Sequence, residues 1–161
     1  MTASAVERFA NFDDLVVGYT SVMRREITAA SVDAFAQLSG DVNPLHIHDS
    51  FAQAAGFSGR VAHGALQAAY LSCLFGTQFP GPGCFWARQT FEWRMPVFIG
   101  DVIDLQATVK HKSAGTRTLL IGVEARNQQG QLVMNGDGMV RMLAKVAGAG
   151  ERAGERAGEQ G

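Results

Sequence analysis

The sequence predicts an α+β fold in which one antiparallel sheet wraps around a single buried helix. Residues 63–76, HGALQAAYLSCLFG, are apolar on nearly every side when placed on a helix, a pattern typical of a buried helix. Four later segments alternate apolar and polar residues with a period of two, as antiparallel strands with one face toward solvent do. A sheet wrapped around the helix gives every side of it apolar partners.

The chain before the buried helix predicts one strand and one helix. VVGYTSVMRREI, residues 16–27, indicates an edge strand. TAASVDAFAQLSG, residues 28–40, indicates a helix with Thr28 as its N-cap and Gly40 as its stop. Its apolar face is imperfect and consists of Val32, Phe35, Ala36 and Leu38.

The four alternating segments follow the buried helix and span residues 84–95, 101–110, 117–126 and 131–143. Turns are expected around Gly115 and Gly130, between the last three segments. In the first segment the odd-numbered positions carry the apolar series, namely Phe85, Ala87, Phe91, Trp93 and Met95. One such sheet leaves open edges and one uncovered side of the helix layer, so we expect a homodimer or a higher homo-oligomer.

Length and composition limit the class of protein. A chain of 161 residues with 47% apolar residues is long enough for one domain with a core. Its net charge of −1 provides no basic stripe for phosphates, so no nucleic-acid partner is expected. Two cysteines, Cys73 and Cys84, favour a reducing compartment over a disulfide framework.

Neither end of the chain resembles part of the predicted core. The N-terminus lacks the basic and apolar regions of a signal peptide, and no apolar run reaches the roughly 18 residues of a membrane span. We therefore expect a cytoplasmic protein without a membrane partner. Residues 146–161 repeat Gly-Glu-Arg-Ala and carry no large apolar residue after Val146, which predicts a disordered tail behind a folded domain of residues 1–145.

Residues 39–64, SGDVNPLHIHDSFAQAAGFSGRVAHG, collect groups that can move protons. Asp41 and His46 flank an Asn43-Pro44 pair, and proline restricts both its own backbone and that of Asn43. The turn can therefore hold a carboxylate and an imidazole on one side, where sharing a water molecule makes them a general acid–base pair.

His63 and Gly64 open the buried helix at the end of the same region. An amide at a helix N-terminus lacks an intrahelical acceptor and lies at the positive end of the helix dipole. Such an amide suits a developing oxyanion. An acid–base pair beside it fits chemistry next to a carbonyl, such as proton movement at Cα with water addition or loss at Cβ.

SGDVNPLH followed by FSGRVAHG resembles the signature of the MaoC-like, (R)-specific enoyl-CoA hydratase family, the hydratase 2 group with a hot-dog fold. FDDLVVGYTS, FPGPG and MPVFIGD extend the similarity over roughly residues 12–144. The resemblance implies reversible hydration of trans-2-enoyl thioesters to (R)-3-hydroxyacyl thioesters.

The resemblance also assigns roles to residues. It implies that Asp41 and His46 are the catalytic dyad, that the Gly64 amide holds the thioester oxygen and that Asn43 supports the dyad. Ser72, on the buried helix, occupies a position where family members place a polar group near the site, and we group His63 with these binding residues.

No metal or redox cofactor is expected, because the conjugated thioester already makes Cβ electrophilic. One departure stands out: the family has His-x-Asp after Asn-Pro-x, whereas this chain has His46-Ile47-His48 and then Asp49. Either Asp49 or Ser50 caps the next short helix, or His48 changes the charge of the site.

Several alternatives remain open from the sequence. His46, His48 and His63 are metal ligands by residue type, and His63 alone also fits simple packing at the helix end. A CoA thioester and an acyl carrier protein thioester would use the same chemistry. A non-catalytic hot-dog subunit and a thioesterase are further candidates, because one fold hosts several activities.

Overall fold

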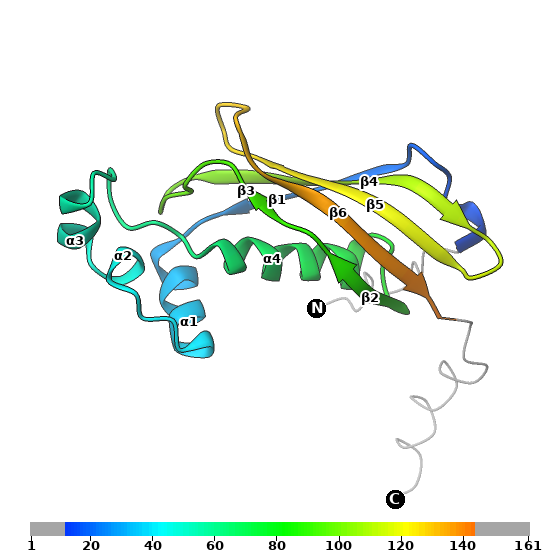
Figure 1. Ribbon diagram of the computed structural model, residues 1–161, viewed down its shortest axis with the longest axis horizontal. Helices are drawn as coiled ribbons and strands as arrows, with labels where there is room; N and C mark the ends of the chain where they lie inside the picture. Colours follow the sequence, from blue (N-terminus) through cyan, green and yellow to red (C-terminus); the bar gives the residue numbers. More distant parts are fainter. Residues whose placement is uncertain (1–11, 144–161) are drawn as a thin grey trace, which may run out of the picture.

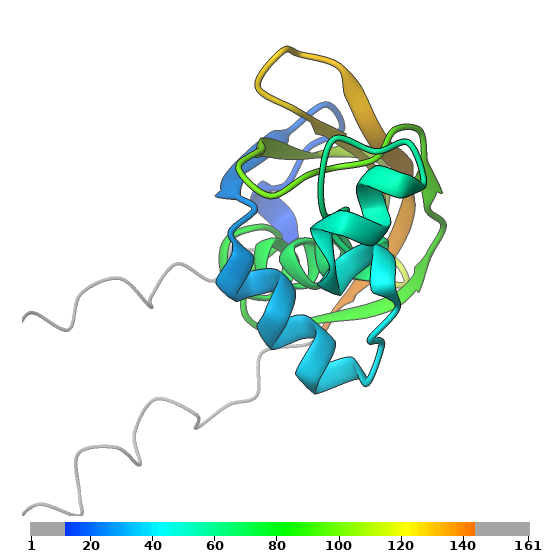
Figure 2. The same cartoon turned by 90° about the vertical axis from the view of Figure 1, so that its left-hand side faces the viewer.

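A computed structural model describes residues 12–143, so the tail predicted over residues 146–161 lies outside the described residues. A six-stranded antiparallel sheet curls around helix α4 (Gly64–Cys73), as the sequence predicts (Figures 1 and 2). Three further helices gather at the end of the sheet where α4 begins (Figure 1). They are α1 (Ala29–Ser39), α2 (Pro44–Ile47) and α3 (Asp49–Ala54).

The N-terminal elements follow the local signals in the sequence. After a short 3-10 helix (Phe12–Asp14), strand β1 runs over Thr20–Glu26 and starts four residues later than expected, because the chain first turns at Gly18, whose φ is 89°. Helix α1 begins after Thr28, whose side chain accepts from the amide of Ser31, and ends at Gly40 with φ 76°. Both predicted caps of α1 are confirmed.

One residue of the predicted apolar face of α1 was placed wrongly. Val32 and Ala36 are buried, but Leu38 is 86% exposed. Leu38 falls two residues after Ala36, which rotates it about 200° away on a helix of 3.6 residues per turn. Apolar character alone therefore did not place it on the inner face.

The sheet has the strand order β1-β4-β5-β6-β2, and β3 also pairs with β6. Its later strands are β2 (Cys84–Gln89), β3 (Glu92–Trp93), β4 (Val102–Ser113), β5 (Thr118–Arg126) and β6 (Leu132–Met142). The turns expected around Gly115 and Gly130 are confirmed, and β4 continues three residues beyond its predicted end. The sheet therefore has open edges at β1 and at β2.

The predicted strand over residues 84–95 is two strands, and its apolar odd face was assigned wrongly. Phe85 is 58% exposed, whereas its neighbour Trp86 packs against the core. A register shift between Trp86 and Arg88 and the break after Gln89 reorient the chain. The break lies against β6, where a Cβ on Gly136 would come within 1.8 Å of the carbonyl oxygen of Thr90. The glycine is thus required by close backbone packing.

Helix α4 crosses the concave face of the sheet and continues into a π-helical turn at Leu74–Gln78. Leu66, Leu71, Leu74 and Phe75 bury their side chains in the core. One strip of the helix nevertheless remains exposed in the single chain, which corrects the expectation of burial on all sides. The strip consists of Ala65, Ala69, Ser72 and Gly76.

Candidate active site

Two short helices occupy the region that the sequence marks as rich in proton-moving groups. Asn43 caps α2: its Oδ1 accepts from the Leu45 amide at 3.1 Å, and Pro44 occupies the first helical position. Proline is well suited to that position because it has no amide hydrogen to satisfy. This single turn of helix fixes the backbone that carries His46.

A main-chain carbonyl determines which ring nitrogen of neutral His46 carries the hydrogen. Nδ1 of His46 lies 2.6 Å from the carbonyl oxygen of Val61. A carbonyl only accepts, so Nδ1 carries the hydrogen and donates it. In the neutral ring Nε2 then has a free lone pair, as a general base requires.

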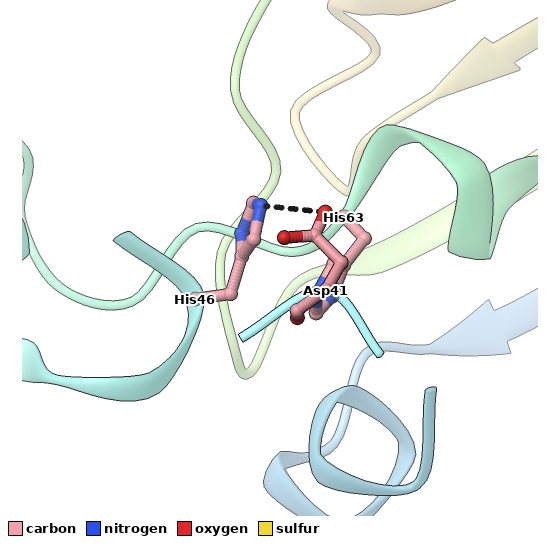
Figure 3. A group of neighbouring side chains, drawn as sticks. All are labelled: Asp41, His46 and His63. Atoms are coloured by element: carbon pink, nitrogen blue, oxygen red, sulfur yellow. Dashed lines mark hydrogen bonds and ion pairs between the residues drawn. The ribbon is translucent and has the colours of Figure 1, made fainter. Parts of the chain in front are cut away.

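Asp41 faces that lone pair. Its Oδ2 lies 3.9 Å from Nε2 of His46, beyond direct hydrogen-bond distance but close enough for one water to bond to both (Figure 3). The other carboxylate oxygen, Oδ1, accepts from the amide of Asn43 at 3.2 Å. Asn43 therefore contacts Asp41 through its main chain and orders the His46 turn through its side chain.

His63 lies against both Asp41 and His46. It is 2% exposed, and its Nε2 hydrogen donates to the main-chain oxygen of Asp41 at 2.9 Å. Its ring stacks on that of His46, with centroids 3.8 Å apart and planes tilted by 31° (Figure 3). The side chain thus ties the Asp41 backbone to the start of α4 and supports the His46 ring.

Asp41, His46 and His63 are close enough to be considered as metal ligands, with one potential ligand atom of each within 4.8 Å of the others. The two imidazoles are stacked, however, so their in-plane lone pairs lie in separate planes inclined by 31° to each other, which does not favour joint coordination of one ion. His48 is exposed and is not part of this cluster, so the ligand set His46, His48 and His63 is not assembled.

Arg60 joins the turn that carries His46 to α1. Its Nε donates to the carbonyl oxygen of His46 at 2.5 Å, and its guanidinium also pairs with Asp33. The Arg60 amide in turn donates to Oδ1 of Asp49 at 3.0 Å. Asp49 therefore holds the loop before α4 and does not cap α3, whose N-cap residue, His48, makes no side-chain cap bond.

Gly64 is the first residue of α4, where the amide has no intrahelical acceptor. A pocket of about 590 Å³ opens beside Gly64 and reaches His46. Its lining is mostly apolar and includes Leu45, Phe57, Val61, Ala65, Trp93, Met95 and Val97. The structure thus brings Gly64 and His46 to one cavity, next to Asp41.

The pocket contains two polar residues that sequence reasoning missed, Gln67 and Arg94, and it lacks one that was expected. Gln67 lines the pocket and is 2% exposed. Ser72 lies two helical turns beyond Gly64 on the exposed strip of α4 and does not line this pocket. The polar break that Gln67 makes in an apolar helix was the signal in the sequence.

A hot-dog sheet around one helix, with an Asp–His pair at the helix N-terminus, defines the class of hot-dog hydratases and dehydratases. The chain belongs to the MaoC-like dehydratase family: the family model described as "MaoC like domain" matches residues 18–129.

No helix among residues 12–143 is long and apolar enough to cross a membrane.

Curated relatives and solved structures agree with this assignment. The chain is 33% identical over 138 residues to a 3-hydroxybutyryl-CoA dehydratase of Methylorubrum extorquens, covering 86% of this chain and 87% of the relative. It is 33% identical to an (R)-specific enoyl-CoA hydratase of Aeromonas caviae, covering 80% and 96%. An (R)-hydratase structure from Pseudomonas aeruginosa superposes with a TM-score of 0.81 at 29% identity, covering 84% and 87%.

Proposed function

We propose that the protein catalyses the reversible addition of water to trans-2-enoyl-CoA thioesters, giving (R)-3-hydroxyacyl-CoA. The observation that carries the proposal is the fixed tautomer of His46, whose free Nε2 faces Asp41 at 3.9 Å beside the first amide of α4. Relatives named as (R)-specific enoyl-CoA hydratases and as a 3-hydroxybutyryl-CoA dehydratase support the same reaction in its two directions.

In the proposed reaction Asp41 and His46 jointly hold the water. One of the two groups takes a proton as the water oxygen bonds to Cβ, and the electron pair of the double bond moves toward Cα and the thioester oxygen. The pair then returns a proton to Cα on the same face, so the coupled groups end in their starting state. Dehydration runs through the same steps in reverse.

The Gly64 amide is proposed to donate to the thioester oxygen. Negative charge grows on that oxygen in the transition state, so the bond strengthens there and lowers the barrier. The apolar pocket beside Gly64 would receive the acyl chain and keep bulk water from the reacting carbons. Asn43 and His63 are proposed to support the dyad by fixing the position of Asp41.

An assay of crotonyl-CoA hydration, measured as the loss of enoyl absorbance, tests the proposal. The expected product is the (R) alcohol, and a chelator is expected to leave the rate unchanged. An (S) product would contradict the assignment, because water would have reached the opposite face of the double bond. The absence of turnover on any enoyl thioester would favour a non-catalytic thioester-binding subunit.

Acyl carrier protein thioesters are the second candidate substrate. The chain is 35% identical over 89 residues to a mitochondrial 3-hydroxyacyl-[acyl-carrier-protein] dehydratase of Arabidopsis thaliana, covering 55% of this chain and 52% of the relative. Comparing kcat/KM for crotonyl-CoA and crotonyl-acyl carrier protein separates the two. We propose CoA because the relatives covered over 87% and 96% of their length are named for CoA substrates at 33% identity, whereas an acyl-carrier-protein dehydratase of Solanum lycopersicum is covered over 72% at 29% identity.

We also propose that the active form is at least a homodimer. Edge strand β2 exposes Phe85, and Trp93 on the adjoining β3 is 49% exposed. The uncovered strip of α4 adds small residues that permit close approach of a second chain. A monomer by light scattering at micromolar concentration would contradict this proposal.

A further inference from the structure

Gln67 has no role in the proposed proton transfers, yet its position calls for a bound partner. It is 2% exposed and lies on α4 one turn after Gly64, on the same side of the helix. Its Oε1 has no hydrogen-bond partner among residues 12–143. A buried carboxamide without a partner is unfavourable, so such groups in native structures usually have a reason.

The residues around Gln67 indicate which part of a bound ligand would carry the polar group that pairs with it. Gln67 and Gly64 line the same pocket, whose walls are otherwise mostly apolar. Arg94 also lines the pocket, but its guanidinium is already paired with Glu92 and Asn135, so the walls suit an acyl chain better than the phosphates of CoA. A ligand that places an oxygen at Gly64 and extends along the pocket would therefore present its acyl chain to Gln67.

The spacing along α4 gives the position on that chain. Three residues advance a helix by about 4.5 Å, which corresponds to roughly three or four bonds of an extended carbon chain. If the thioester oxygen lies at Gly64, the carboxamide of Gln67 lies beside C4 and C5 of the acyl group. These carbons lie beyond the double bond on which the dyad acts.

We infer that Gln67 is a specificity-determining residue that selects acyl thioesters carrying a hydroxyl group at C4 or C5. A hydroxyl both donates and accepts, so it satisfies the carboxamide through either its oxygen or its nitrogen. An alkyl chain at the same place covers the carboxamide without pairing it. A pocket that bonds a substrate hydroxyl discriminates strongly against an analogue that lacks one, because its own polar group is then left unpaired.

Because this inference rests on the proposed function, its test uses a readout that needs no turnover. Isothermal titration would compare two saturated thioesters with the same number of non-hydrogen chain atoms, 5-hydroxypentanoyl-CoA and hexanoyl-CoA, in which a hydroxyl replaces the terminal methyl group. One neutral hydrogen bond of ordinary strength predicts about 10-fold tighter binding of the hydroxylated ligand relative to the alkyl one. In Gln67→Leu the preference should reverse, and Gln67→Met provides a second unbranched apolar replacement of similar length.

Gln89→Leu is the matched control. Gln89 also has an Oε1 without a partner among the described residues, but it lies on β2 and does not line this pocket. This variant should keep the wild-type binding ratio. Wild-type protein that binds both ligands equally, or binds hexanoyl-CoA more tightly, would overturn the inference. So would a ratio that Gln67→Leu and Gln67→Met leave unchanged.

The crotonyl-CoA assay separates this inference from the proposed function. Crotonyl-CoA ends at C4 and carries no hydroxyl, so its hydration reports on the dyad alone. If the protein does not hydrate crotonyl-CoA but still binds the hydroxylated ligand more tightly, the proposed reaction is overturned and the role of Gln67 is not. An equal loss of kcat by Gln67→Leu on crotonyl-CoA and on longer substrates, with no change in relative affinity, would make Gln67 a general positioning residue and overturn its role in selection.

Discussion

Substituting Gly64 by alanine tests how closely the pocket is built around the start of α4. An ideal Cβ at this position would lie 2.7 Å from both Cε2 and Nε1 of Trp93. Ordinary carbon contacts begin near 3.5 Å, so the indole must move by roughly 0.8 Å. The main-chain amide of residue 64 stays in place, but the cavity wall in front of it shifts.

The expected effect on stability is small and the expected effect on catalysis is large. Overpacking typically costs about 1–3 kcal/mol, and the higher helix propensity of alanine offsets up to about 1 kcal/mol of that cost. Trp93 is 49% exposed and has room to relax outward. A misplacement of about 1 Å near the reacting atoms lowers a rate by up to about 10²-fold. We therefore expect kcat/KM to fall by about 10²-fold while the unfolding free energy drops by no more than about 2 kcal/mol.

Crotonyl-CoA hydration rates and denaturant unfolding curves measure the two effects. Gly115→Ala is the control, because a Cβ there meets nothing within 4 Å and Gly115 lies in the turn between β4 and β5, away from α4. Adding Trp93→Phe to Gly64→Ala should restore part of the activity by making room. Full activity in Gly64→Ala would refute the reasoning, since the displaced ring would then have no part in shaping the site.

Further predictions concern the dyad, its support and the partly buried thiol of Cys84. Asp41→Asn and His46→Gln should each lower kcat by at least about 10²-fold without unfolding the protein, as measured by steady-state kinetics and circular dichroism; near-normal turnover in either would remove that residue from the dyad. Arg60→Met should lower kcat by about 10-fold and shift the pH profile of kcat, because the carbonyl of His46 loses its donor. Arg60→Lys should recover only part of the rate, since one ammonium cannot reproduce the contacts with both His46 and Asp33. An unchanged pH profile in Arg60→Met would leave Arg60 with a purely structural role. Burial raises the pKa of the Cys84 thiol, whose hydrogen also donates to the carbonyl of Phe75. Alkylation of Cys84 at pH 7 should therefore be at least about 10-fold slower than that of a free cysteine, as measured by peptide mass spectrometry. Rapid labelling would instead indicate that the thiol is open to solvent.

Features set by short-range bonding could be predicted from the sequence. Thr28 and Gly40 bound α1 as expected because a cap depends on groups within a few residues of it. Asp41 and His46 face each other as expected because the intervening Asn43-Pro44 pair restricts the backbone between them. The alternation of the later strands likewise predicted the sheet, since one buried face imposes a period of two.

Features that depend on distant segments could not be predicted in this way. The carbonyl that fixes the tautomer of His46 belongs to Val61, and the acid paired with Arg60 is Asp33 on another helix. No local pattern connects these positions. The outward orientation of Phe85 follows from a register shift, and both faces of that strand carry apolar residues, so periodicity alone could not assign the inner one.

The hydrogen bond between His46 and the carbonyl of Val61 has a consequence for how such a site persists through sequence change. Every amino acid supplies the same carbonyl, so no side-chain replacement at position 61 deletes the acceptor. Only a shift of the backbone between α3 and α4 would do so, and that backbone is itself bonded to the segment between β3 and β4, where the Ala62 amide donates to the carbonyl of Val97 at 2.7 Å. The tautomer of His46 therefore depends on the backbone of the fold, and the side chain at position 61 can change without altering it.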